Sequence, residues 1–450
     1  MKIKGFLGII TFFLLYSAVK PCFTVVVGRE ASGSGAVLLA HNEDEMGDPP
    51  VKIWWVPSRQ GLERFKLLNG ALQTWRGNPE MLWVEMKLKY FSDFFVNSYG
   101  VAVVSNACAS RVKGQRDGIS YFLRRLAVER ASSAREAVRR AGELIEKYGY
   151  PEGRTLTFVD PKEGWLMHIL GGKHWLAWRV PDDAVALLAN NFTAGEVDLR
   201  DRENLMHSKG FLSFAVKKGY LKKGEFKFHF SRTFSVNYSK KYNAGRWLSA
   251  YKILTGRDYA DAPPFPPYIK LTYKVGPRKI FEVLRQRPQT GLDLPSLFSI
   301  RSVCYYTTKH SFVLSVGGVE PGKILLWFSP ARPDASPYIP IFFSARKLFP
   351  PWKGSHSEIL RQHFIITPEF RAEIPHLLYL PFRTYADAHY LNPHGQVRKW
   401  ERLEETFFYL VRQGKERVKE LLKEGKVREA EEFLTNLTGG ALEMARSQLR

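Results

Sequence analysis

Cysteine is scarce in this chain, and the sequence lacks the motifs that usually bind metals. The three cysteines among its 450 residues, Cys22, Cys108 and Cys304, are far apart and form no CxxC pair. This spacing excludes a disulfide framework and a cysteine-based zinc motif. The 11 histidines form no HExxH pattern. The sequence therefore predicts no metal site and no organic cofactor.

Acidic residues are also few in comparison with basic ones. The chain has 44 acidic and 67 basic residues, which gives a formal charge of +23. The positive charges are spread along the chain and mixed with acids, and no RRM, KH, zinc-finger or basic-helix pattern accompanies them. We therefore expect no nucleic-acid partner, whereas association with an anionic envelope surface remains open. With 45% hydrophobic residues, the chain can bury a large core.

Long apolar runs are absent except at the start of the chain. Two lysines precede an apolar stretch over residues 5–18, and Lys20 and Pro21 follow it. This order is typical of a secretory signal, so we assign 1–21 to a signal peptide and short propeptide and expect a secreted or periplasmic protein. A retained membrane anchor is the alternative, but the run is shorter than the roughly 20 residues that a span needs. Pro21 directly before Cys22 is a poor cleavage junction, so a second cleavage is expected to uncover Cys22.

The remaining pattern predicts a mixture of antiparallel strands and helices. Residues 23–28 and 36–40 predict a hairpin around a Gly/Ser turn, with Cys22 at its free end. Helical periodicity predicts a helix pair over 119–148, with Ser132 or Ser133 as a cap, and charge pairs predict a helical tail over 399–450. The other expected elements are strands at 101–105, 156–160, 164–170, 174–180, 184–190, 311–317 and 323–329, and a helix at 243–254.

A cysteine that becomes the first residue of a mature chain carries a thiol and a free α-amine a few ångströms apart. An α-amine has an ordinary pKa of roughly 7.7 to 8, so it can take the thiol proton and later return it to a leaving amine. Cys22 would then supply both the nucleophile and the base. On position alone, an incidental cysteine at a processing site is the alternative.

Several motifs occur in an order that resembles a known enzyme family. Cys22 and its hairpin lead into LLAHNED, and NSYGVAVVSN, LAVERASSAREAV, DPKEGWLMHILGGKHWLAWRVPDDAVALLANNF, YNAGRW and LLWFSPARPDASPYIPIF follow. This series resembles the cysteine dipeptidases of the N-terminal-nucleophile hydrolase superfamily, which include PepD-type enzymes and are related to secernins. The resemblance covers roughly residues 22–342.

The resemblance implies a fold and a partition of the chain. The implied fold is α+β, a four-layer αββα sandwich with a helical C-terminal extension. We expect a catalytic domain over 22–395 and a helical extension over 396–450. The sequence does not indicate an oligomeric state.

The resemblance also implies catalytic residues. Cys22 matches the nucleophile, Asp44 the aspartate that orients it, Asn106 and Asn190 two oxyanion-side asparagines, and Arg246 an arginine near the active centre. For each partner of the cysteine, a structural residue in a turn or at a helix start is the alternative.

One position departs from the wider superfamily. His41 stands where the acylases of the superfamily carry an arginine, and an imidazole cannot replace a bidentate guanidinium. A role in placing the thiol and a plain strand-end histidine are therefore both open for His41.

The expected function is that of an exported cysteine-type dipeptidase, a thiol protease that cleaves small peptides through a thioester. Two alternatives remain. One is an N-acyl amide hydrolase similar to penicillin V acylases and bile salt hydrolases. The other is a non-catalytic envelope-binding protein on a degenerate scaffold, which the departure at His41 and the poor junction at Pro21 would explain.

Overall fold

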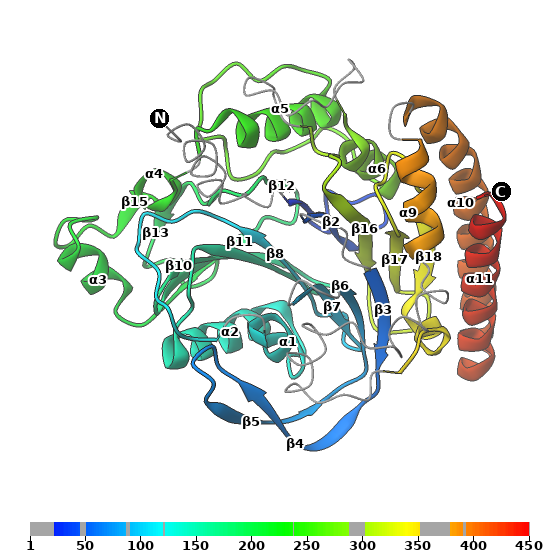
Figure 1. Ribbon diagram of the computed structural model, residues 1–450, viewed down its shortest axis with the longest axis horizontal. Helices are drawn as coiled ribbons and strands as arrows, with labels where there is room; N and C mark the ends of the chain where they lie inside the picture. Colours follow the sequence, from blue (N-terminus) through cyan, green and yellow to red (C-terminus); the bar gives the residue numbers. More distant parts are fainter. Residues whose placement is uncertain are drawn as a thin grey trace, which may run out of the picture.

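The computed structural model shows two antiparallel β-sheets packed face to face, with helices on their outer faces (Figure 1). It describes residues 22–45, 51–86, 91–119, 122–236, 238–287, 302–351, 379–389 and 393–449. The expected signal segment, 1–21, lies outside these residues. None of the helices within the described ranges has both the length and the hydropathy needed to cross a membrane.

The first sheet has six strands and contains the predicted N-terminal hairpin. Its order is β12 (Val185–Leu188), β1 (Phe23–Val27), β2 (Val37–Asp44), β16 (Thr308–Val316), β17 (Ile324–Ser329) and β18 (Ile339–Phe342). The hairpin of β1 and β2 pairs Thr24 with His41. Because β2 also pairs with β16, segments far apart in the sequence lie side by side at the centre of this sheet.

The second sheet has eight strands. Its order is β14 (Leu205–His207), β11 (His174–Val180), β10 (Gly164–Gly171), β9 (Arg154–Val159), β8 (Ala102–Ala107), β7 (Phe91–Asn97), β6 (Met81–Met86) and β3 (Val51–Val56). The strands predicted between residues 101 and 180 are confirmed as β8 to β11. The strand predicted at 184–190 is confirmed as β12, which lies in the other sheet and pairs with β1.

Strand alternation divides the apolar side chains of the first sheet between its two faces. Val26 and Leu39 lie between the sheets, in one cluster with Val104 of the second sheet. Val25 and Leu38 point the opposite way, into a cluster that includes side chains of the helices on that side. Each strand of the hairpin is therefore buried on both faces. The face that carries Val26 and Leu39 lies against the second sheet.

Helices cover both outer faces, which confirms the predicted four layers. The second sheet is covered by α1 (Phe122–Val128) and α2 (Ala134–Tyr148), and the first sheet by α5 (Lys241–Thr255) and α6 (Pro277–Arg285). The predicted helix pair is thus α1 and α2, and the helix predicted at 243–254 is α5. Of the two candidate caps, Ser133 is the N-cap of α2, and its side chain accepts a hydrogen bond from the backbone N–H of Glu136.

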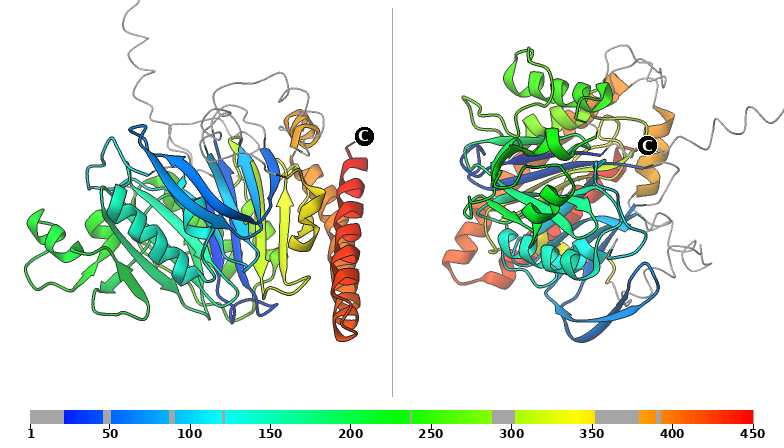
Figure 2. Two further views of the ribbon diagram at one scale, coloured as in Figure 1. Left: turned by 90° about the horizontal axis from the view of Figure 1, so that it is seen from below. Right: turned by 90° about the vertical axis from the view of Figure 1, so that its left-hand side faces the viewer.

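The predicted helical tail is a pair of helices, α10 (Pro393–Lys423) and α11 (Val427–Ser447), preceded by α9 (Tyr379–Ala388). Figure 2 shows the pair standing along one side of the molecule, beside β18. Phe407 and Leu434 from these helices share one apolar cluster with Trp327 of β17. The partition into 22–395 and 396–450 stays a prediction, and the described helices pack directly on the first sheet.

Some elements were not predicted. Residues 45–97 had no assigned element, yet they contain β3, β6 and β7 of the second sheet and a separate hairpin of β4 (Arg59–Lys66) and β5 (Leu72–Asn78). The short elements are β13 (Glu196–Asp198), β15 (Lys227–His229), α3 (Phe211–Lys217), α4 (Phe230–Phe234) and the 3-10 helix η1 (Phe343–Leu348).

Candidate active site

Cys22 lies immediately before β1, and its side chain points into the space between the two sheets. Val26 of the same strand belongs to the cluster between the sheets, and residues two apart in a strand share a face. Cys22 and Thr24 therefore lie on this face as well. Cys22 is almost fully buried, with 4% of its surface exposed.

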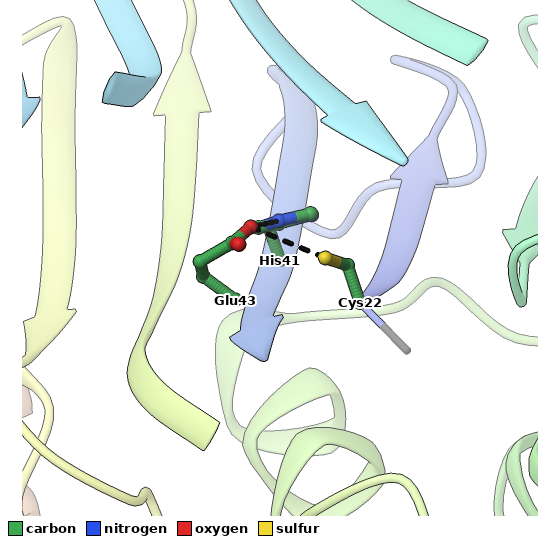
Figure 3. A group of neighbouring side chains, drawn as sticks. All are labelled: Cys22, His41 and Glu43. Carbon is green, nitrogen blue, oxygen red and sulfur yellow. Dashed lines mark hydrogen bonds and ion pairs between the residues drawn. The ribbon is translucent and has the colours of Figure 1, made fainter. Parts of the chain in front are cut away.

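The neighbouring strand β2 places two ionisable side chains beside the thiol. The hairpin register pairs Phe23 with Asn42 and Thr24 with His41, so Glu43 is the next residue to face Cys22. The Cys22 thiol donates a hydrogen bond to Oε2 of Glu43 at 3.3 Å. The same oxygen lies 3.0 Å from Nε2 of His41 (Figure 3). Thiol, carboxylate and imidazole thus form one continuous buried group.

The chain of hydrogen bonds continues from His41 to the second sheet. The Thr24 hydroxyl donates to Oδ1 of Asn106 at 2.6 Å, and its oxygen lies 2.8 Å from Nδ1 of His41. A hydroxyl has one proton, so Nδ1 of His41 must donate to Thr24. One further proton lies between Nε2 of His41 and Oε2 of Glu43. The imidazole is therefore held in a defined orientation, with Nε2 directed at the carboxylate beside the thiol.

Asn106, on β8, has a second feature relevant to catalysis. It is fully buried, and its Nδ2 amide has no hydrogen-bond partner among the residues that the structure describes. Leaving a buried donor unsatisfied costs about 1–3 kcal/mol. An oxyanion formed near Cys22 requires a donor of this kind, so the geometry is compatible with the role predicted for Asn106, which stays a prediction.

Arg246, on α5, contacts Cys22 directly. Its fully buried guanidinium donates to the backbone carbonyl of Cys22 at 2.9 Å. It also donates to Oδ1 of Asn190 at 3.0 Å and to Oδ1 of Asn243 at 2.8 Å. The helix layer is thereby connected to the start of β1. Asn243 belongs to the YNAGRW motif but was not predicted as a member of this group.

Asn190, just after β12, is held in a special conformation. It is the only non-glycine residue with positive φ among the described residues, at 58°. Its Nδ2 donates to the carbonyl of Ala107 at 2.9 Å, and its Oδ1 accepts from Arg246. These bonds place Asn190 next to the backbone of Cys22. Its predicted oxyanion role is untested, and one of its two amide N–H groups is already used by Ala107.

Asp44 lies on the other face of β2. Asn42, two residues earlier, donates to backbone carbonyls on the helix side of the sheet, and alternation places Asp44 on that side too. Its carboxylate accepts a hydrogen bond from Thr308, and its backbone oxygen lies 4.0 Å from the thiol of Cys22. The carboxylate that meets the thiol is that of Glu43. The orienting role predicted for Asp44 stays a prediction.

A further buried histidine faces the same space. His310 of β16 pairs with Glu43 in the register of the first sheet. Burial, and then the charge of His41, lower the pKa of His310 from 6.5 to about 3, so its ring is neutral near pH 7. Neither ring nitrogen has a hydrogen-bond partner within the described part of the chain.

The other two cysteines are also buried. Cys108 is buried and its thiol lies 3.2 Å from the Thr155 hydroxyl, and burial raises its pKa from 9.0 to about 12. Burial likewise raises the pKa of Cys304. Both therefore remain protonated thiols at neutral pH.

Sequence reasoning missed the central partners of the thiol. Neither Glu43 nor Thr24 was predicted to be part of this hydrogen-bonded group. The available signal was the alternation of β1 and β2, which allows Cys22, Thr24, His41 and Glu43 to share one face of the same sheet. One sulfur, one nitrogen and one oxygen from Cys22, His41 and Glu43 lie within 4.8 Å of one another, an arrangement that could hold a metal ion.

Similarity to known proteins was found at three levels. The profile of peptidase family C69 matches residues 109–352, more than half of the chain. This span contains Asn190 and Arg246 and begins after Cys22. A probable dipeptidase of Salmonella dublin is 26% identical over 382 residues, covering 77% of this chain and 86% of that protein.

The other similarities are less extensive. A probable dipeptidase of Latilactobacillus sakei is 26% identical over 227 residues, 48% of each protein, so the chain spans about half the length of that relative. Among solved structures, a penicillin V acylase from Agrobacterium tumefaciens is 13% identical, with a TM-score of 0.38 and coverage of 72% of this chain and 86% of that one. A TM-score below 0.5 supports no conclusion about this chain.

Proposed function

The chain belongs to peptidase family C69, as the sequence motifs predicted, and we propose that it is an exported cysteine dipeptidase with Cys22 as its N-terminal nucleophile. The observation that supports this best is the position of Cys22. Its thiol is hydrogen-bonded to Glu43 between the sheets, and its carbonyl is held by Arg246. A residue held both at its backbone and at its thiol in this way has a defined direction of attack.

The proposed mechanism uses groups on the first two strands and β8. In the mature chain the α-amine of Cys22 takes the thiol proton, and the thiolate attacks the carbonyl carbon of the peptide bond. Nδ2 of Asn106 donates to the developing oxyanion, a contribution on the order of 3 kcal/mol. The α-amine then protonates the leaving amine, and water hydrolyses the thioester.

Export and substrate class are parts of this proposal. The signal-like residues 1–21 support delivery to the cell envelope or beyond, where the charge of +23 would favour anionic surfaces. The names of the relatives support dipeptides as substrates. N-acyl amides are the second substrate class to test, because a thiolate with an oxyanion donor attacks any suitably placed amide carbonyl.

The test is turnover of a dipeptide set and of N-acyl amides by the mature protein and its Cys22→Ala variant. We expect dipeptide hydrolysis that disappears in Cys22→Ala and persists in the control Cys108→Ser, which removes a buried thiol outside the site. Hydrolysis of N-acyl amides alone would identify an acylase. Native-rate turnover by Cys22→Ala, or no turnover of either class, would overturn the proposal.

A further inference from the structure

We infer that Cys22, His41 and Glu43 form a binding site for one zinc-class divalent cation, and that the bound cation blocks the thiol. The ligands are the Cys22 sulfur, Nε2 of His41 and a Glu43 carboxylate oxygen. The binding site stands on geometry alone, whereas its inhibitory effect rests on the proposed function of Cys22.

The donor atoms already lie near the separations that zinc requires. Zinc bonds are roughly 2.3 Å to sulfur and about 2.0–2.2 Å to nitrogen or oxygen, so tetrahedral angles hold the donors about 3.3–3.6 Å apart. Here sulfur and carboxylate oxygen are 3.3 Å apart, and oxygen and imidazole nitrogen 3.0 Å. All three atoms lie within 4.8 Å of one another. A cation therefore needs only small side-chain movements.

The outer partners orient the imidazole for metal binding. Metal-binding histidines usually donate their second ring N–H to a fixed acceptor, which sets the tautomer. Nδ1 of His41 donates to Thr24, whose hydroxyl in turn donates to Asn106. Nε2 is thus the nitrogen directed toward Glu43 and the thiol. This arrangement spans both sheets and does not depend on the metal.

The chemistry of the donors selects the class of cation. A thiolate and an imidazole favour zinc and similar transition metals, whereas magnesium and calcium prefer oxygen ligands. A thiolate and a carboxylate together also balance the two charges of the cation, and the three residues are nearly completely buried. Three protein ligands leave a fourth position for water.

Inhibition of the proposed peptidase reaction follows from the bond between the metal and the Cys22 sulfur. A sulfur bound to zinc donates a lone pair to the metal, which lowers the nucleophilicity of the thiolate and occupies one side of the sulfur, so its attack on a peptide carbonyl is suppressed. Zinc displaces the thiol proton and the proton between His41 and Glu43, and both are released to solvent. No redox change is involved, so removal of the metal by a chelator restores the thiol.

The binding test is titration of the mature protein with Co²⁺, which reports thiolate ligation through its absorption. We expect one equivalent to produce a thiolate-to-cobalt charge-transfer band with tetrahedral d–d bands, and Zn²⁺ to displace it. His41→Asn and Glu43→Gln should each weaken binding by more than about 100-fold. Thr24→Val, which removes only the outer partner of His41, should weaken it about 10–100-fold. The control His207→Asn, on β14, should bind normally.

The outcomes separate this inference from the proposed function. Absence of the charge-transfer band, its persistence in Cys22→Ala, or equal binding by His41→Asn and the folded control would overturn the site. Dipeptidase activity that depends on Cys22 would still support the proposed function in those cases. If the site binds metal, Zn²⁺ should abolish turnover and a chelator should restore it. Activity raised or unchanged by saturating Zn²⁺ would overturn the inhibitory effect.

Discussion

Replacement of Arg246 by lysine tests how the start of β1 is held. The Arg246 guanidinium is fully buried and donates to the Cys22 carbonyl, to Asn190 and to Asn243 from two different nitrogens. A lysine ammonium is a single point on a flexible stem and cannot serve acceptors that a planar guanidinium reaches in different directions. We therefore expect Arg246→Lys to leave at least one buried acceptor without a donor.

The magnitude follows from the number of acceptors lost. Each buried acceptor left without its partner costs about 1–3 kcal/mol, so loss of one or two predicts a decrease of about 1–6 kcal/mol in the free energy of unfolding. If the Cys22 carbonyl is one of the acceptors that lose their donor, the backbone that carries the thiol is no longer held in place. A misplacement that raises the activation barrier by about 1.4 kcal/mol lowers kcat tenfold.

The assay is urea unfolding of the mature protein, combined with kcat and KM for a dipeptide. Arg278→Lys is the matched control, because Arg278 is exposed and pairs with Glu405 at the surface. We expect the control to change the free energy of unfolding by less than about 0.5 kcal/mol. An Arg246→Lys variant as stable and as active as the parent would refute this account of the anchor.

Three further predictions concern other groups. Asn106→Leu should lower kcat by about 10²–10³-fold with little change in KM, and an unchanged kcat would rule out its oxyanion role. Burial lowers the pKa of His168 from 6.5 to about 3, so its neutral form stabilises the fold above pH 6.5 and this contribution is lost as the pH falls toward 3. Urea unfolding at pH 4 should show a loss of about 3 kcal/mol from this residue, and His168→Gln should depend less on pH; equal dependence would contradict the assignment. Glu404→Gln should cost about 3–5 kcal/mol because it leaves the buried Arg285 cation without its partner, and a loss below 1 kcal/mol in urea unfolding would contradict this.

The sequence predicted those parts of the fold that depend on local pattern. The hairpin of β1 and β2 followed from β-branched residues on either side of a Gly/Ser turn, and α2 followed from apolar periodicity behind a serine cap. Pairing of β2 with β16 was beyond local pattern, because the two segments are separated by most of the chain. The strands between residues 51 and 97 were missed, although β3 is rich in valine and tryptophan.

The site shows the same difference between local and distant information. The order of the motifs predicted Cys22, Asn106, Asn190 and Arg246 as residues of one site. The fold places all four around the start of β1 and the facing strand β8. The orienting role that motif matching predicted for Asp44 stays a prediction, whereas its neighbour Glu43 lies on the opposite face of β2 and meets the thiol. The hydrogen bond to Oε2 of Glu43 depends on that alternation and on the register of the hairpin.

The central claim is that Cys22 acts as the first residue of the mature chain. The most direct measurement is the mass of the N-terminal peptide of the exported, active protein, obtained by proteolysis and mass spectrometry. The account predicts a peptide that begins at Cys22, with residues 1–21 removed. An active protein whose chain begins upstream of Cys22 would contradict the account, because its cysteine would have no α-amine to act as the base.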